Sequence, residues 1–116
     1  MGEAELKRRY DLYLRDILES IKHIQNYITN MDAENFAKSP ITIDAVMRNL
    51  EIIGEAATQM PKNITDQHKE IPWRDIQDFR IVAAHKYWKI NIERIWDIIE
   101  NKINLLKEQI QNILKD

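Results

Sequence analysis

The chain has 116 residues, a formal net charge of −2 and a pI of about 5.9, and it contains no cysteine. That length predicts one domain, residues 1–116, with a core of its own, and the missing cysteines exclude disulfides, thiolate nucleophiles and cysteine-ligated metals. The slight acidic excess excludes a general attraction to nucleic acid, so a role in binding nucleic acid would require a local basic patch.

Helices are favoured throughout, because glycine (2) and proline (3) are scarce while isoleucine, leucine, glutamate, lysine and glutamine are abundant. No apolar run approaches the ~20 residues that span a bilayer, and the first ten residues lack the apolar core of a signal peptide. Together with the absence of cysteine, which suits a reducing compartment, these features predict a cytoplasmic protein that does not associate with a membrane.

The first predicted helix covers roughly residues 4–30. Its apolar residues recur every three or four positions, as on the buried face of an amphipathic helix: Leu6, Tyr10, Tyr13, Ile17, Ile21, Ile24 and Ile28. Near its start lies a basic cluster of Lys7, Arg8, Arg9 and Arg15. This cluster could touch RNA phosphates, but it is more typical of a solvated helix end.

The second predicted helix covers roughly residues 41–59, after a connection over residues 30–40. Ser39 and Pro40 are a typical N-cap and first helical residue. The expected core positions of this helix are Ile43, Val46, Leu50, Ile53, Ala57 and Met60. Gly54 lies in the helix interior, where it costs about 1 kcal/mol relative to alanine, so we expect another helix to approach closely there.

Residues 61–73 are expected to form a polar loop with one helical turn, in which His68 is solvated. Pro72 then restarts a helix, with Trp73, Ile76, Arg80 and Ala84 along one side. The last predicted helix begins near Asn91, and its face consists of Ile92, Ile95, Ile99, Ile103, Leu106, Ile110 and Ile113. Four helices with short connections predict an all-α antiparallel up-down bundle.

The last helix is apolar beyond that face, at Trp96, Ile98, Leu105 and Leu114. A small bundle that has closed would leave part of so wide a stripe exposed, which favours a homodimer. Trp88 and Trp96 are expected either in the core or at such an interface.

The clearest local basic patch begins at Arg80 and continues through His85, Lys86 and Lys89, and no acid occurs from Arg80 to Ile92. A guanidinium suits a phosphate and stays charged, and an imidazole with an unperturbed pKa near ~6.5 exchanges protons at neutral pH. Lys86 and Lys89 are candidate phosphate contacts, and Tyr87 adds a hydroxyl.

These groups fit RNA cleavage without a metal, in which the ribose 2′-OH attacks the adjacent phosphorus. That reaction needs a base, an acid and a cation for the developing charge. On an ideal helix Arg80 and His85 lie about 140° apart, at ~100° per residue, and one histidine cannot readily be both acid and base. A two-fold dimer that brings both copies to one cleft would supply the second histidine.

Simpler interpretations stay open, because Arg and His at this spacing also occur on ordinary solvated helix faces. No Glu-x-x-His pair occurs that would predict a di-iron bundle, so His23, one turn after Glu19, is expected at the surface. We expect no metal and no cofactor.

Several stretches strengthen the interpretation that this is a site of RNA cleavage: "RIVAAHKYW" (80–88), "AVMRNLEIIGEAA" (45–57), "IPW" (71–73), "DILESI" (16–21) and "ERIWDII" (93–99). In this order they resemble the HEPN superfamily, and within it the HepT-like toxins that pair with a minimal nucleotidyltransferase. The resemblance implies a homodimeric four- or five-helix bundle with the R-x4-H-x-Y motif at the dimer cleft, acting as an endoribonuclease through Arg80 and His85.

The resemblance also implies a cognate nucleotidyltransferase antitoxin, which neutralises the toxin by transferring AMP to Tyr87. In addition it suggests that Glu55 pairs with Arg80 and orients it. Ile81 departs from the family pattern, which commonly has a polar residue, often asparagine, directly after the motif arginine. The alternative is therefore a catalytically inactive bundle that binds a nucleotidyltransferase partner or a nucleotide.

Overall fold

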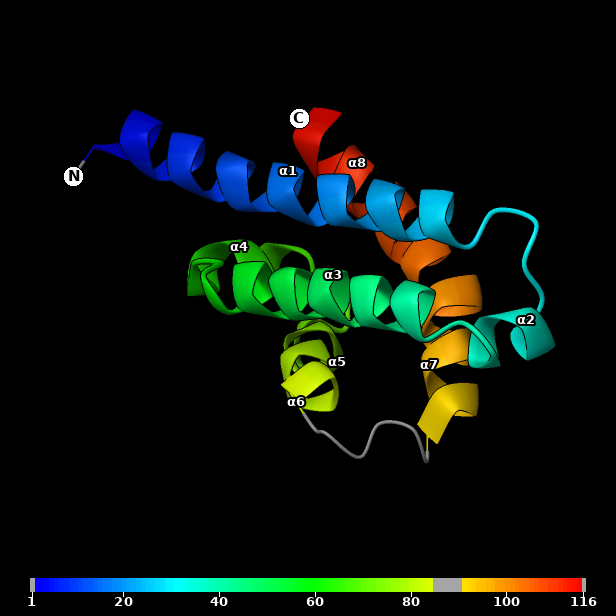
Figure 1. The fold of residues 1–116 in the computed structure, drawn as a ribbon. Helices are drawn as coiled ribbons and strands as arrows, with labels where there is room; N and C mark the ends of the chain where they lie inside the picture. The colour runs from blue at the N-terminus through cyan, green and yellow to red at the C-terminus, as the bar shows by residue number, and fades with distance from the viewer. Residues whose placement is uncertain (1, 85–90, 116) are drawn as a thin grey trace.

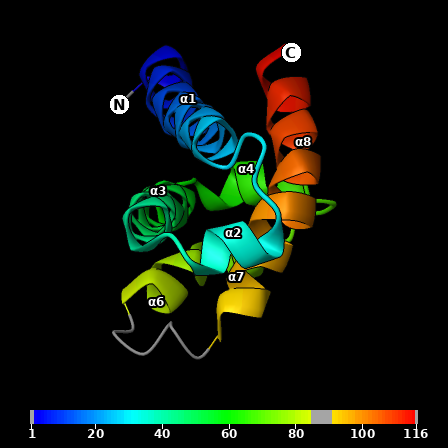
Figure 2. The ribbon, with the colours of Figure 1, turned by 45° about the vertical axis from the view of Figure 1, so that its right-hand side comes forward.

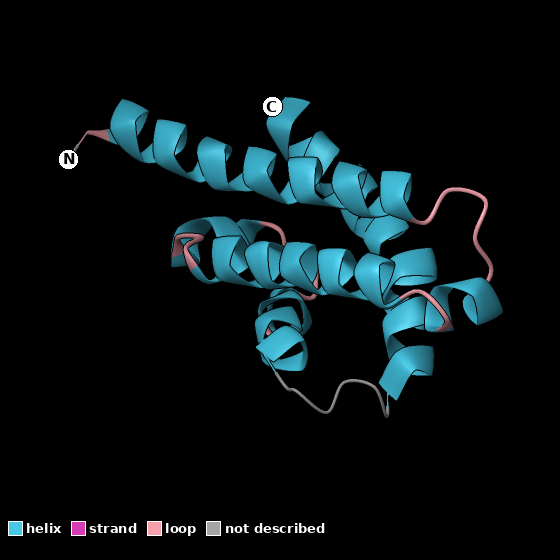
Figure 3. Ribbon diagram, in the orientation of Figure 1, coloured by secondary structure: helices cyan, strands magenta, loops and turns pink. Residues whose placement is uncertain are grey.

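The computed structural model describes residues 2–84 and 91–115, and every regular element within those ranges is helical (Figure 3). The elements are α1 (Glu3–Tyr27), α2 (Ala33–Ala37), α3 (Pro40–Thr58), α4 (Lys62–Gln67), α5 (Trp73–Gln77), α6 (Phe79–Ala84), α7 (Ile92–Asp97), the π-helical segment η2 (Ile98–Lys102) and α8 (Ile103–Lys115). Four helical segments, α1, α3, α5–α6 and α7–η2–α8, make up the bundle (Figure 1). The predicted all-α bundle is confirmed.

Helix α3 lies at the centre, with α1 on one side and α5 and α6 on the other (Figure 1). All six core positions predicted for this helix are buried. From α1, the core receives Leu14, Ile17, Ile21 and Ile24, none of which has exposed surface. Leu6 was expected in the core and is 43% exposed, because the first turns of α1 extend past the other helices.

Helix α8 runs antiparallel to α1 and packs against it (Figure 2). At one end, Gln25 Nε2 donates to Asn104 Oδ1 at 2.8 Å, so the end of α1 meets the start of α8. At the other end, Tyr10 and Leu114 line one hollow. None of the helices in the two described ranges is both long and apolar enough to cross a bilayer.

The connection predicted between the first two helices contains the short helix α2. Asp32 caps it by accepting a 2.8 Å hydrogen bond from the Asn35 backbone N–H, and Phe36 is fully buried against Trp96, with ring centroids 5.3 Å apart. Pro40 begins α3 as predicted, but Ser39 makes no backbone cap. Its hydroxyl donates instead to Thr42 Oγ1 at 2.8 Å.

The polar loop contains the predicted helical turn as α4, and His68, expected to be solvated, is partly exposed. The His68 side chain is 21% exposed, and its Nδ1 lies 3.4 Å from Glu70 Oε1. The backbone carbonyl of His68 accepts a 3.0 Å hydrogen bond from Trp73 Nε1. The buried indole therefore holds this end of the loop against the bundle.

One helix was predicted after Pro72, and the structure divides it at Asp78 into α5 and α6. The Asp78 carbonyl accepts from the backbone N–H groups of both Ile81 (2.9 Å) and Val82 (3.1 Å). The buried side continues from Trp73 and Ile76 to Phe79, rather than to Arg80 as expected. This local change of register turns the arginine outward.

The last predicted helix is interrupted by η2, where the consecutive residues Ile98 and Ile99 are both buried. A π-turn holds one more residue than an α-turn, so the buried face shifts between α7, which contacts α2, and α8, which contacts α1. Trp96 is half-buried against Phe36, while Leu105 remains 57% exposed. The homodimer that this apolar surplus favours stays a prediction.

Candidate functional site

Arg80 owes its position to the contact between α6 and Gly54 in α3. A Cβ atom at position 54 would lie 2.6 Å from the Arg80 backbone nitrogen and 3.0 Å from the Gln77 carbonyl oxygen. Real Cβ atoms are not found that close to backbone, so any larger residue would push the two helices apart. The close approach predicted at Gly54 is confirmed, and it is made by the backbone of the motif arginine itself.

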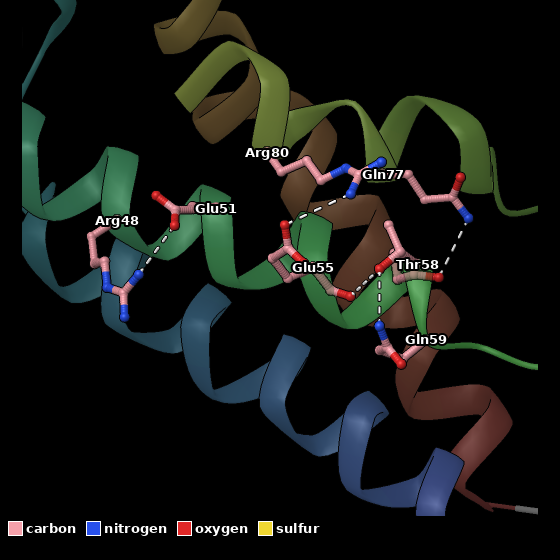
Figure 4. A network of polar contacts seen from close by, with 8 residues as sticks. Arg48, Glu51, Glu55, Thr58, Gln59, Gln77 and Arg80 are labelled. Carbon is pink, nitrogen blue, oxygen red and sulfur yellow. Dashed lines mark hydrogen bonds and ion pairs between the residues drawn. The ribbon is translucent and has the colours of Figure 1, made fainter. Parts of the chain in front are cut away.

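The Arg80 guanidinium lies beside Glu55, with Nη1 and Oε1 3.8 Å apart (Figure 4). Both side chains are largely exposed, at 45% and 56%. A surface pair of this kind adds at most about 1 kcal/mol to stability, and 3.8 Å is longer than a hydrogen bond. The contact therefore keeps the guanidinium over α3 but leaves it able to turn toward an incoming anion.

A hydrogen bond from the Gln77 side chain supports this arrangement from the side of α5. Gln77 Nε2 donates to the carbonyl oxygen of Ala57 at 3.4 Å (Figure 4). Since Gln77 also approaches Gly54, the amide contact and the glycine hold the same pair of helices together. Arg80 thus extends from a segment whose distance to α3 is set by contacts at Gln77 and at Arg80 itself.

A hollow of about 300 Å³ opens next to Glu55, between α1 and α3. It is lined by Tyr13, Asp16, Arg48, Glu51, Ile52, Glu55, Ala56 and Gln59. One of the three carboxylates, Glu51, pairs with Arg48 at 3.3 Å (Figure 4). Three carboxylates against one arginine make this hollow unfavourable for a phosphate.

Two residues that follow Arg80 in the chain, Ile81 and Arg94, take other positions. Ile81 is 48% exposed, so an apolar side chain faces solvent directly after the arginine. Arg94 lines a separate hollow of about 120 Å³, between α5–α6 and α7–η2, together with Asp75 and Asp78. Arg94 is thus set among carboxylates, while Arg80 is not among the residues that line that hollow.

The remaining predicted site residues, His85, Lys86, Tyr87 and Lys89, lie outside the described residues, as does Trp88. Their relation to Arg80 stays a prediction. Across the described part of the chain, no group of three or more histidines and carboxylates is arranged to hold a metal ion. His23 lies at the surface as expected, with Nε2 3.1 Å from Glu19 Oε1.

Sequence reasoning identified the Glu55–Arg80 pair and the close contact at Gly54, but it missed the rest of the surroundings. Tyr13 and Asp16 come from α1 and meet Glu51 only through the packing of α1 on α3. No spacing within the sequence marks such a combination. Gln77 was missed for the same reason, because its partner is a backbone carbonyl twenty residues away.

Known ribonuclease-like proteins match nearly the whole length of this chain. The family model described as "Ribonuclease HepT-like" matches residues 17–113. A protein of Methanocaldococcus jannaschii named as an RNase is 36% identical over 95% of this chain and 91% of its own length. Another RNase by name, from Caldanaerobacter subterraneus subsp. tengcongensis, is 34% identical over 89% of this chain and 92% of its own.

A third relative, from Thermococcus cleftensis, is named as a HepT ribonuclease. It is 34% identical over 95% of this chain and the whole of its own length. All three names are qualified as provisional. No solved structure matches the chain significantly.

Proposed function

The chain belongs to the HepT-like ribonuclease family, and on that premise we propose that it is a metal-independent endoribonuclease with Arg80 and His85 as its catalytic groups. The observation that carries the proposal is the position of Arg80. Its guanidinium is exposed, lies on a helix held against Gly54, and is only loosely paired with Glu55. An arginine with no role toward a ligand would not need so constrained a backbone and so available a head group.

In the proposed reaction, the 2′-OH of one nucleotide attacks the adjacent phosphorus and the bond to the 5′ oxygen breaks. One His85 imidazole takes the 2′ proton, and a second, from the other subunit of a homodimer, gives a proton to the leaving 5′ oxygen. The products are a 2′,3′-cyclic phosphate and a free 5′-OH. Arg80 stabilises the charge on the phosphate oxygens as the transition state forms, and Lys86 and Lys89 hold neighbouring phosphates.

Single substitutions test the assignment. Replacing Arg80 by alanine should lower kcat/KM for RNA by a factor of at least ~100, the usual effect of losing one group that stabilises a transition-state oxyanion. His85→Ala should lower it at least as much, and melting curves would verify that both variants are folded. A variant that retains wild-type cleavage would remove its residue from the mechanism.

The shared site is tested with mixed dimers. Dimers of one wild-type chain and one His85→Ala chain should cleave far less than the average of the two homodimers, because each composite site would lack one proton carrier. Activity equal to that average would show that each subunit works alone.

We further propose that the protein is the toxin of a toxin–antitoxin pair, neutralised when a nucleotidyltransferase partner transfers AMP to Tyr87. An adenylyl group would place a negative phosphodiester and a bulky base two residues from His85, where it would compete with RNA for Arg80. Incubation with the partner and ATP should add adenylyl mass to the wild-type chain but not to a Tyr87→Phe variant. An unchanged wild-type mass, or mass still added to the variant, would contradict this proposal.

The exposed Ile81 favours one alternative, a catalytically inactive bundle that binds the nucleotidyltransferase or a nucleotide. An apolar side chain next to Arg80 cannot hydrogen-bond a phosphate or orient an imidazole. Expression of the chain without its partner distinguishes the two functions. Growth arrest that Arg80→Ala or His85→Ala relieves supports the nuclease, whereas no arrest, or arrest that survives both substitutions, supports the binding module.

A further inference from the structure

A groove of about 410 Å³ runs between α1 and α8, and half of its six lining residues are basic. Arg15, Leu18, Glu19 and Lys22 line it from α1, and Lys107 and Gln111 line it from α8. Three cationic side chains therefore face one carboxylate, in a chain whose net charge is −2. This is the reverse of the hollow beside Arg80, where three carboxylates accompany one arginine.

The charges of the groove are not used by the fold. Within residues 2–84 and 91–115, no carboxylate forms an ion pair with Arg15, Lys22 or Lys107. Lys107 Nζ donates to the neutral Gln25 Oε1 at 3.3 Å. The groove's own acid, Glu19, lies 3.1 Å from His23 Nε2 rather than against one of the cations. All three cations are thus available to an external anion.

The groove is not part of the site at Arg80. Helix α6, which carries Arg80, packs on α3, whereas α1 and α8 lie on the opposite side of α3 (Figures 1 and 2). The two shorter axes of the molecule measure 26 and 22 Å. At about 3.4 Å per stacked nucleotide, a strand needs on the order of ten nucleotides to reach from one side to the other.

We propose that this α1–α8 groove binds the phosphate backbone of the RNA substrate, away from the bond that is cleaved; the inference rests on the proposed ribonuclease function. Arg15 and Lys22 are seven residues apart on α1, two turns or about 10 Å along one face, and Lys107 lies across the groove from them. Cations in a row suit a polymer that carries one charge per nucleotide and whose backbone has no required sequence.

An acidic protein segment fits the groove less well. A docked helix buries an apolar stripe in an apolar groove, and Leu18 is the one aliphatic side chain among the six that line this groove. The remaining five offer charge and hydrogen bonds. The lining thus favours a flexible polyanion over a folded or helical partner.

The test compares two variants that lose the same amount of charge. The groove variant is R15Q/K22Q/K107Q, and the control is K38Q/K62Q/K69Q, whose first two lysines already pair with Glu34 and Asp66. Binding is measured by fluorescence anisotropy on a 30-nucleotide 2′-O-methyl RNA, which has no 2′-OH and cannot be cleaved. Cleavage is measured on an unmodified three-nucleotide RNA, which even when extended is shorter than the 22 Å short axis of the molecule and so does not reach the groove from Arg80.

We expect the groove variant to bind the long strand at least tenfold more weakly than wild type, with a salt dependence whose log–log slope is smaller by about 2, at about 0.7 per phosphate contact for single strands. The control should bind within twofold of wild type, and both variants should cleave the three-nucleotide RNA normally. Equal binding by groove and control variants would overturn the inference, as would a groove variant that loses affinity for polyglutamate but not for RNA. Failure of wild type to cleave any RNA would instead count against the proposed function, while the uncleavable strand would still report on the groove.

Discussion

Helix α3 contacts α1 on one side and α5–α6 on the other, and the two contacts are built differently. The core that α1 and α3 share contains branched apolar side chains without exposed surface, such as Ile17, Ile21 and Ile53. Toward α6, the distance is set by the absence of a side chain at Gly54, and the neighbouring Arg80–Glu55 pair is exposed. Buried area holds the scaffold side, whereas backbone contact sets the position of Arg80.

This comparison teaches that stability and site geometry depend on different residues of one helix. Burying an isoleucine contributes about 1.5–3 kcal/mol, so buried residues such as Ile17, Ile21 and Ile53 stabilise the fold. The surface pair on the other side supplies at most about 1 kcal/mol. Substitutions on the two sides should therefore separate the free energy of unfolding from the activity toward RNA.

The largest loss of stability is expected on the scaffold side, at Ile21. Replacing Ile21 by alanine leaves a cavity in the core, and the free energy of unfolding measured with urea should fall by about 2–5 kcal/mol. The kcat/KM of the fraction that stays folded should remain near the wild-type value. A large loss of activity in fully folded protein would contradict the separation of the two sides.

Gly54→Ala should affect both quantities. The added methyl group meets the Arg80 backbone nitrogen at 2.6 Å, so α6 has to move. We expect a loss of about 1–3 kcal/mol in unfolding free energy and a fall of about a hundredfold in kcat/KM, because small displacements of catalytic groups are costly. Gly2→Ala, where a Cβ meets nothing within 4 Å, is the matched control and should change neither.

Glu55→Gln should change activity with almost no change in stability. Loss of an exposed pair alters the unfolding free energy by less than about 1 kcal/mol, but Arg80 loses the group that orients it. We expect kcat/KM to fall about tenfold, mainly through KM, and Glu55→Asp to restore part of it. Glu51→Gln, one turn earlier and paired with Arg48, is the control. Equal effects of the two glutamine variants would mean that Glu55 does not position Arg80.

The smallest effect is expected at Ile81, whose side chain is 48% exposed. Replacing it by asparagine supplies a hydrogen-bonding group beside Arg80, and kcat/KM should rise about fivefold, the equivalent of one hydrogen bond of about 1 kcal/mol. Ile81→Ala serves as the control for removing apolar surface alone. If asparagine and alanine act alike, the polar group has no part in catalysis.

Local pattern was a good guide to the core positions of α3. Spacings of three and four residues identified positions in and just after this helix that all proved buried, because residues at that spacing lie along one side of an α-helix. The same reasoning failed for Leu6, since periodicity does not reveal where the neighbouring helices end. It also failed at Arg80, because the turn residue Asp78 shifts the buried side to Phe79.

The sequence by itself determined the helical class, the order of the main helices, the motif residues and the need for close packing at Gly54. These follow from spacing, composition and the absence of a side chain, which are properties of single segments. Only the tertiary structure decided what surrounds Arg80 and which helices line the acidic hollow and the basic α1–α8 groove. Those features join side chains from helices far apart in the chain, and the packing that brings them together leaves no periodic trace in the sequence.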